Sequence, residues 1–258
     1  MSSLSVIIIT KNEADNILSC LDSVKFANEI IVLDSGSTDE TVSLCQQYTD
    51  NVHQVDWPGF GIQKNRALQK CTSAWVLAID ADEIVSSALR QEITTLIKNE
   101  SLHSAYRIPR KSKYCNQFMA FGDWRKDSCV RLFKKDKAIF KELPVHEALI
   151  VDGTVGKLQG PLLHNSFSNF EEVLHKINDY STLSATYKFA EGKRSGLLKA
   201  IVRGGWTFFR GYFLRLGFLD GRKGFMLAIS NAEGCYYRYL KIMLLHDELS
   251  SADNSKSS

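Results

Sequence analysis

Proline, paired cysteines and long apolar runs are scarce in this sequence, and each scarcity excludes a class of protein. Four prolines and 16 glycines in 258 residues exclude collagen-like and Pro-rich low-complexity chains. The six cysteines include no C-x-x-C pair, so we expect reduced thiols in a cytosolic protein rather than a disulfide framework. No uncharged apolar run reaches the roughly 18–20 residues of a membrane span. The run at Leu4 has no basic leader, so we expect no signal peptide.

Several motifs of phosphate binding and hydrolysis are also missing. No G-x-G-x-x-G follows the first apolar run, where KNEADN stands instead, and no Walker lysine loop occurs. These absences argue against the usual dinucleotide and P-loop sites. His146 and Glu147 are not followed by the second histidine of a zinc-protease helix, and no G-x-S-x-G elbow is present. Any phosphate recognition is therefore expected to depend on a metal ion.

The overall composition is that of a globular protein. The chain is 44% hydrophobic and 24% charged, so we expect one large domain, or a domain with a smaller appendage. The net charge is +3, yet residues 188–223 hold nine basic side chains against two acidic ones. Positive charge is therefore concentrated in one stretch of the chain.

In the first third of the chain, continuous apolar runs alternate with segments whose apolar residues have helical spacing. Continuous apolar runs predict four buried parallel strands: 4–10, 29–34, 51–56 and 75–80. The first intervening helix has its predicted buried stripe on Ile17, Leu18, Leu21 and Val24. Ser37 and Glu40 have capping-box spacing and predict the start of the next helix, and a third covers 62–70. The predicted fold class is α/β, a Rossmann-like, mostly parallel sheet with helices on both faces.

The pattern changes after Asp82. A helix over 89–97 precedes three short pieces, SAYRIP, CVRLFKK and AIFKE, which predict an antiparallel extension of the sheet. Ser168 and Glu171 have capping-box spacing and predict the start of a long helix. We expect three parts: a sheet domain over 1–165, a helical region over 166–249 and a disordered polar tail over 250–258.

Acidic side chains follow two of the predicted strands. Asp34 ends the second strand, and Asp80, Asp82 and Glu83 follow or end the fourth. Ligands of open parallel sheets bind outside the carboxyl ends of the strands. Clustered carboxylates there suit a hard divalent cation, Mg²⁺ or Mn²⁺. Asp39 lies at a predicted helix start and belongs either to this site or to a helix N-cap.

Four motifs in a fixed order connect these acids to a known family. SVIIITKNEADNI, IIVLDSGSTDET, GIQKNRAL and WVLAIDADE resemble the N-terminal half of the GT-A-fold family 2 glycosyltransferases, inverting enzymes that use nucleotide-activated sugars. DADE matches the D-x-D motif of that family. The resemblance implies a GT-A domain over 1–165 that binds a UDP-sugar donor together with a divalent metal.

The resemblance also implies the residues of the nucleotide-sugar pocket: Thr10, Asn12, Glu13, Asp34, Lys64, Asn65, Asp80 and Ala81. Asp34 would bond the uracil or ribose and Asp80 the ribose, while Asp82, with Asp80 beside it, would hold the metal. Lys64 stands where the family has an arginine, so the charge is kept without the planar two-pronged donor geometry. The alternative for Lys64 is a place on a solvated helix face.

The second half of the chain resembles a narrower branch, the bacterial lipopolysaccharide core glycosyltransferases that add β-linked glucose to an inner-core sugar. LPVHEAL and FFRGYFLRLGFLDGRKGF carry this resemblance. Inversion by single displacement needs a group that deprotonates the acceptor hydroxyl. Glu147 is the expected base and His146 its orienting partner, although Glu142 could exchange roles with Glu147. The alternative is that these residues only hold a loop together by hydrogen bonds.

The basic aromatic stretch allows two interpretations. Arg203, Arg210 and Arg215 with the neighbouring aromatic residues could form an interfacial helix on an anionic membrane surface. Alternatively, the arginines bind a phosphorylated, lipid-linked saccharide acceptor. No RNP-like or helix-turn-helix pattern accompanies them, so nucleic acid is not an expected partner.

The sequence therefore predicts a metal-dependent inverting hexosyltransferase that moves glucose from UDP-glucose to a lipopolysaccharide core sugar. Its expected place is peripheral, on the cytoplasmic face of the inner membrane. One rival prediction is a polyprenyl-phosphate glycosyltransferase of the same fold, which needs no base because a phosphate oxygen is the nucleophile. The other is a sugar-nucleotide-binding or membrane-scaffold protein without turnover, which UDP-sugar hydrolysis would exclude.

Overall fold

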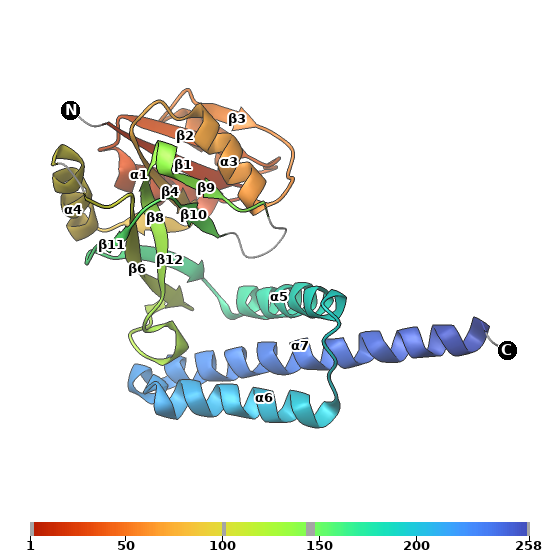
Figure 1. Cartoon of the computed structure of the whole chain (residues 1–258). Helices are drawn as coiled ribbons and strands as arrows, with labels where there is room; N and C mark the ends of the chain where they lie inside the picture. Colours follow the sequence, from red (N-terminus) through yellow and green to blue (C-terminus); the bar gives the residue numbers. More distant parts are fainter. Residues whose placement is uncertain (1–2, 100–101, 143–147, 257–258) are drawn as a thin grey trace. The chain divides into compact units, whose positions relative to one another are not determined.

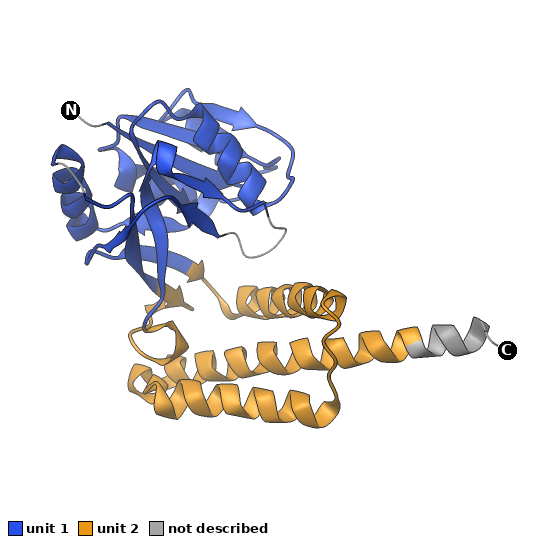
Figure 2. Cartoon of the chain, viewed as in Figure 1, with its two compact units in different colours: residues 1–111, 126–165 blue, residues 112–125, 166–258 orange. Residues whose placement is uncertain are grey.

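Two structural units make up the chain. The computed structural model describes residues 3–99, 102–142 and 148–256. The first unit comprises residues 1–111 and 126–165, and the second unit comprises residues 112–125 and 166–258 (blue and orange in Figure 2). The second unit thus takes up a short segment, 112–125, that precedes the boundary expected near residue 165.

Parallel strands form the centre of the first unit (Figure 1). β1 (Leu4–Thr10) lies between β2 (Glu29–Asp34) and β4 (Trp75–Asp80), and β3 (Val52–Gln54) pairs with the outer edge of β2. β1 is buried along its whole length, as its continuous apolar run predicts. The parallel order is confirmed, and β3 is shorter than the predicted strand over 51–56.

An antiparallel extension continues this sheet, as predicted. β8 (Ser128–Lys134) pairs antiparallel with β4, and β6 (Ala105–Tyr114) pairs antiparallel with β8. The remaining strands are β5 (Glu83–Val85), β7 (Gln117–Phe118), β9 (Ala138–Phe140), β10 (Leu149–Val151), β11 (Val155–Lys157) and β12 (Leu162–Phe167). β12 pairs antiparallel with β5, which places His164 opposite Glu83. A histidine late in the chain therefore lies beside the acids that follow β4.

Helices cover both faces of the parallel strands. The helices of this unit are α1 (Ala14–Val24), α2 (Thr41–Gln46), α3 (Phe60–Lys70) and α4 (Ser87–Lys98). Val6 of β1 packs in one core with residues of α1, α2 and α4, whereas Ile7 packs in a second core with residues of α3. Successive strand side chains point to opposite faces, so one apolar run supplies both cores. The predicted α/β class is confirmed.

Two local predictions about these helices are wrong. α2 begins at Thr41 rather than at a Ser37 capping box, because the backbone N–H and the hydroxyl of Ser37 donate to the carboxylate of Asp34. Leu18 is 37% exposed, and Cys20 takes its place among the buried side chains of α1. Cysteine packs as a small apolar residue, which a search for large apolar side chains misses.

Three helices dominate the second unit: α5 (Phe170–Ala190), α6 (Leu197–Phe209) and α7 (Gly221–Lys256). Short helical turns of the chain are η1 (Gly122–Trp124), η2 (Lys135–Lys137), η3 (Arg210–Leu214) and η4 (Gly217–Asp220). α6 and α7 run side by side (Figure 1), and a Cβ added at Gly204 would lie 3.3 Å from the carbonyl oxygen of Ala232. The absence of a side chain at Gly204 therefore permits the close approach of these two helices.

The start of α5 differs by one residue from the prediction. The side-chain oxygen of Asn169 accepts the backbone N–H of Glu172 at 3.0 Å, and the Glu172 carboxylate accepts the N–H of Ser168 at 2.8 Å. The N-cap is therefore Asn169 instead of Ser168, because an Asn side chain caps a helix as well as a serine does.

α7 overlaps the polar tail for which the sequence predicts disorder. Its bounds reach Lys256, and side chains beyond Leu249 lie outside the described residues, so the expectation for 250–258 stays a prediction. Within the described part of the chain, no helix combines the length and the apolar character that crossing a bilayer requires.

Candidate functional site

Parallel pairing brings several predicted site residues to one edge of the sheet. Thr10, the last residue of β1, is in register with Asp34 at the end of β2. Ile9 is in register with Asp80 at the end of β4. Thr10, Asp34 and Asp80 therefore lie at neighbouring strand ends, which is where open parallel sheets bind their ligands.

Two cations hold the carboxylate of Asp80. Lys64 Nζ of α3 lies 2.8 Å from Asp80 Oδ1, and the Arg131 guanidinium of β8 donates to Oδ2. Burial acts to raise the pKa of Asp80, but the charges and hydrogen bonds of Arg131 and Lys64 outweigh burial and hold the pKa well below its usual range. Asp80 is therefore ionised at neutral pH, and each of its oxygens has a protein partner.

Lys64 does not lie on a solvated helix face. Its side chain is 2% exposed, and Nζ lies 5.8 Å from the centroid of the Phe140 ring. A buried ammonium group needs a compensating charge, which Asp80 supplies. The solvated interpretation is wrong, and the lysine fixes the position of the Asp80 carboxylate.

Glu83 extends this network beneath Asp80. Its side chain is fully buried, and Oε1 lies 3.0 Å from Arg131 Nη2 and 3.3 Å from Arg110 Nη1. Its other oxygen accepts the backbone N–H of Asp80 at 3.0 Å. Neither Arg131 nor Arg110 was among the predicted site residues. The available signal was an arginine in the middle of the apolar run CVRLF, because a buried arginine requires a carboxylate.

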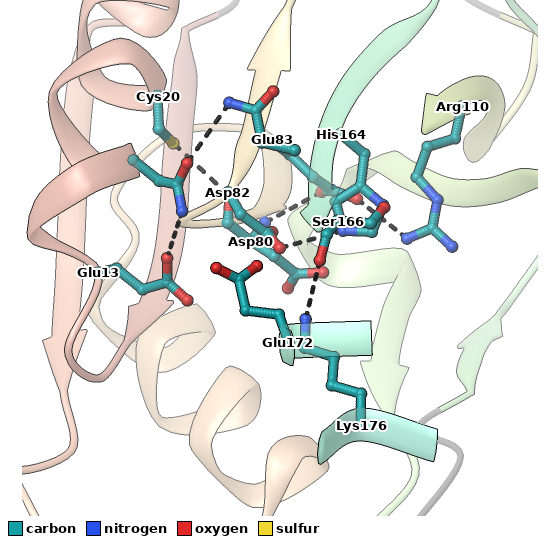
Figure 3. Close-up of polar contacts among 12 residues, drawn as sticks. Glu13, Cys20, Asp80, Asp82, Glu83, Arg110, His164, Ser166, Glu172 and Lys176 are labelled. Atoms are coloured by element: carbon teal, nitrogen blue, oxygen red, sulfur yellow. Dashed lines mark hydrogen bonds and ion pairs between the residues drawn. The ribbon is translucent and has the colours of Figure 1, made fainter. Parts of the chain in front are cut away.

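Asp82 has a different environment. Its Oδ2 lies 3.1 Å from His164 Nε2 of β12 (dashed line in Figure 3), and each of the two side chains is 16% exposed. Ala81, between the two aspartates, is buried. His164 is absent from the sequence predictions because 82 residues separate it from Asp82. A carboxylate and an imidazole that solvent reaches are thus paired outside the buried network.

The ends of β1 and β2 differ in their hydrogen bonds: Asp34 has partners within the chain, whereas the hydroxyl of Thr10 has none among the described residues. Asp34 is fully buried, and its carboxylate accepts the backbone N–H groups of Gly36 at 3.0 Å and Ser37 at 2.9 Å. Asp34 therefore shapes the turn after β2. Thr10 Oγ1 is buried and has no hydrogen-bond partner among the described residues. A buried hydroxyl of this kind is available to a ligand or an ordered water.

Two loop residues after β1 are held by the neighbouring loop and helix. Asn12 has a φ of 54°, and its side-chain oxygen accepts the backbone N–H of Thr38 at 2.8 Å. Glu13 accepts the side-chain amide of Asn16 at 2.9 Å, and its backbone N–H donates to Thr41 Oγ1 at 2.8 Å. These contacts fix the loop that borders the strand ends.

The N-terminal part of the chain matches a family of known enzymes. The model of glycosyl transferase family 2 matches residues 5–146, more than half of the chain. The chain belongs to this family. LpsC of Rhizobium meliloti, named a lipopolysaccharide core biosynthesis glycosyltransferase, is 32% identical and covers 94% of this chain and 93% of its own length. An uncharacterized glycosyltransferase of Rickettsia felis is 31% identical, over 98% of this chain and 93% of that protein. A crystal structure of S. aureus TarS in complex with UDP-GlcNAc is 14% identical, with a TM-score of 0.47, over 92% of this chain and 89% of that one.

This family 2 glycosyltransferase has the GT-A-like fold that the sequence predicts. The first unit supplies the mixed sheet with helices, and the second unit supplies the C-terminal helical region. The acids that end or follow β4 belong to the DADE segment, so Asp80 and Glu83 lie within the part of the chain that matches the family. The transferase class of the protein follows from this membership.

A divalent cation fits this glycosyltransferase at Asp82. Among the described residues, no group of three or more His, Cys, Asp or Glu side chains could hold a metal ion by protein ligands alone. Magnesium commonly uses only one or two carboxylates together with substrate phosphates and water. Asp82, with His164 beside it, offers such a partial set, whereas Lys64 and Arg131 already neutralise the charge of Asp80. The geometry favours Asp82 over Asp80 as the ligand.

The predicted acceptor-side residues are described only in part. Glu142 is exposed, whereas His146 and Glu147 lie outside the described residues, so the three roles stay predictions. Asn65 is buried and makes two hydrogen bonds of 2.9 Å with the backbone of Phe140. Asn65 thus anchors β9, the strand that precedes Glu142.

Proposed function

We propose that this glycosyltransferase transfers glucose from UDP-glucose to an inner-core sugar of lipopolysaccharide by single displacement. The relative LpsC, which aligns with nearly the whole chain, is named for lipopolysaccharide core biosynthesis. The observation that carries the donor part is the Asp82–His164 pair beside the buried network that fixes Asp80. A solvent-reachable carboxylate on such a rigid frame suits a cation that in turn binds a diphosphate.

The reaction exchanges one bond at the anomeric carbon for another and transfers one proton. The acceptor hydroxyl oxygen attacks the anomeric carbon while the bond to the UDP leaving group breaks, and the hydroxyl proton passes to a base. A divalent cation held by Asp82 would neutralise charge on the departing diphosphate. Asp80 keeps lone pairs beyond those that Lys64 and Arg131 use, so it can still accept a ribose hydroxyl. Thr10 Oγ1, at the neighbouring strand end, is a further partner for the nucleotide.

Glu147 is the proposed base, and its removal is the test of the function. Glu147→Gln should keep the UDP-glucose affinity of the wild type while transfer to a core oligosaccharide falls about 10²–10⁴-fold, since that is the usual contribution of general-base catalysis. Calorimetry measures donor binding, and chromatography of labelled oligosaccharide measures transfer. Glu142→Gln is the comparison variant, because Glu142 is the other carboxylate of the segment.

Three outcomes would overturn this proposal in different ways. If Glu147→Gln transfers sugar at the wild-type rate, Glu147 is not the base. If Glu142→Gln loses transfer instead, Glu142 is the base. Transfer to a polyprenyl phosphate that both variants retain would favour the rival acceptor class. A wild-type protein that neither transfers nor hydrolyses UDP-glucose would contradict the function itself.

We also propose that the second unit contacts an anionic membrane. An exposed apolar surface, here called the α6 face, comprises Leu197, Leu198, Ile201, Val202, Phe209, Phe213 and Leu214. The surrounding stretch 188–223 carries nine basic residues. Apolar side chains flanked by basic ones suit a helix that lies in a lipid interface, where each basic residue contributes about 1 kcal/mol.

Flotation with vesicles tests the membrane contact. The wild type should float with vesicles that contain anionic lipid, and the double variant Leu198→Ser/Val202→Ser should bind at least about tenfold more weakly, since each buried apolar side chain contributes about 1.5–3 kcal/mol. Leu102→Ser is the matched control, because Leu102 is 95% exposed in the first unit and should not affect flotation. A wild type that stays at the bottom, or a double variant that floats equally, would contradict the proposal.

A further inference from the structure

A solvent-open cavity of about 520 Å³ lies on the second unit. Helices α5, α6 and α7 form most of its wall. The segment 112–125, the end of β12 and the chain around η3 supply the rest. Pockets for small ligands usually measure about 300–1,000 Å³. Every residue that lines the cavity belongs to the second unit, so the predicted nucleotide-sugar site of the first unit contributes no residue to it.

Positive side chains dominate the charge of the lining. The cations are Lys176, Arg203, Arg210, Arg215 and Arg238. One carboxylate of the lining, Asp123, lies 2.7 Å from Arg215 Nη1 and 3.3 Å from Arg210 Nη2. In the described part of the chain, Lys176, Arg203 and Arg238 have no carboxylate partner. A single carboxylate cannot neutralise five cations, and the excess positive charge favours an anionic ligand.

Two of these arginines have buried donors that nothing satisfies. The Nε atoms of Arg210 and Arg238 are buried and have no hydrogen-bond partner among the residues that the structure describes. Buried donors in folded proteins nearly always have an acceptor. Because these Nε atoms have almost no accessible area, a ligand would reach the terminal nitrogens of the guanidinium groups instead. The planar guanidinium group matches two oxygens of a phosphate through these nitrogens.

The remaining wall is aromatic and hydroxyl-bearing rather than purely cationic. The rings are Tyr114, Trp124, Phe167, Tyr180, Trp206 and Tyr239, and the polar side chains include Thr207, Ser230 and Asn231. The guanidinium carbons of Arg203 and Arg238 lie 5.9 Å and 5.3 Å from the centroid of Tyr239, which helps to order both arginines. A phosphate ion alone would leave these rings unused, whereas a sugar ring has both apolar C–H faces and hydroxyl groups.

We propose that this cavity binds a saccharide that carries a phosphate group. The phosphate binds the arginines, with Arg238 and Arg203 as its main partners, and the sugar ring lies against the aromatic wall. The assignment of this saccharide to the acceptor rests on the proposed function, but its binding in the cavity does not. The ligand class is a sugar phosphate ester, either soluble or at the head of a lipid-linked saccharide.

Calorimetry on the full chain tests this inference with glucose 6-phosphate as the probe. The sugar phosphate should bind at least about tenfold more tightly than glucose or inorganic phosphate, because only it engages both parts of the lining. Arg203→Gln and Arg238→Gln should each weaken binding at least about tenfold, since each removes a charge-assisted hydrogen bond. Arg222→Gln is the matched control, because Arg222 is exposed in the same unit, outside the cavity, and should change affinity less than about twofold.

The outcomes separate the possible ligands. Equal affinity for inorganic phosphate would overturn the saccharide part, and so would competition by vesicles of phosphatidic acid, which carries the phosphate without a sugar. Equal weakening by Arg222→Gln would overturn the assignment to the cavity. Arg203 is exposed, so Arg203→Gln keeps the test valid if Arg238→Gln fails to fold. A wild type that hydrolyses UDP-glucose but does not bind glucose 6-phosphate overturns this inference alone. A wild type that binds glucose 6-phosphate but transfers no sugar overturns the proposed function alone.

Discussion

Asp82→Asn should lower kcat/KM for sugar transfer by about 10²–10³-fold, which is the usual effect of removing one group that stabilises charge in a transition state. The amide keeps the shape of the carboxylate and can still accept a hydrogen bond from His164, which lies 3.1 Å away. The negative charge that would hold a cation against the diphosphate is lost. Transfer is measured over a titration of Mn²⁺, and the variant should need a higher concentration of the metal.

Asp152→Asn is the matched control for this prediction. The side chain of Asp152 is 78% exposed in the same unit and pairs with Lys137 at 2.8 Å, so its neutralisation should leave transfer unchanged. The free energy of unfolding of Asp82→Asn should lie within about 1 kcal/mol of the wild-type value, because the amide can keep the hydrogen bond to His164. An Asp82→Asn enzyme with wild-type turnover and wild-type dependence on Mn²⁺ would exclude Asp82 as the metal ligand.

Arg131→Met should reduce the free energy of unfolding by about 3–5 kcal/mol, because removal of one partner leaves buried charge uncompensated. Arg131 is 6% exposed and contacts both Asp80 and Glu83, of which Glu83 is fully buried. Methionine fills similar space without the charge. Urea denaturation at pH 7 measures the loss.

An exposed ion pair and the pH dependence of stability provide the controls for this second prediction. Arg66 lies 2.7 Å from Asp56, but these side chains are 36% and 75% exposed, so Arg66→Met should cost less than about 1 kcal/mol. The folded-state pKa of Asp80 is lowered, so its ion pairs stabilise the fold above the unfolded pKa of about 3.9 and lose this effect as the pH falls further. The difference between the wild type and Arg131→Met should therefore shrink in acid. A similar cost for both variants at pH 7 would show that burial of the network contributes nothing.

Local patterns predicted the frame of the first unit well. β1, β2 and β4 have the predicted bounds, because a continuous apolar run is a property of neighbouring residues and a parallel strand buried on both faces requires it. The capping residues were less predictable. Ser37 and Ser168 both have the spacing of a capping box. Ser37 donates to Asp34 instead, and Asn169 caps α5, so only the fold decides which contact forms.

The sequence by itself determined the α/β frame, the family and the position of the acids at the end of β4. Only the tertiary structure decided what those acids contact. Arg131 is 51 residues from Asp80, and His164 is 82 residues from Asp82, so no local pattern links the members of either pair. The cavity of the second unit likewise gathers its arginines from two helices and a turn. Ion pairs and cavities depend on distance in space, which the pairing of strands and the packing of helices set, whereas periodicity records only the environment of each residue along its own element.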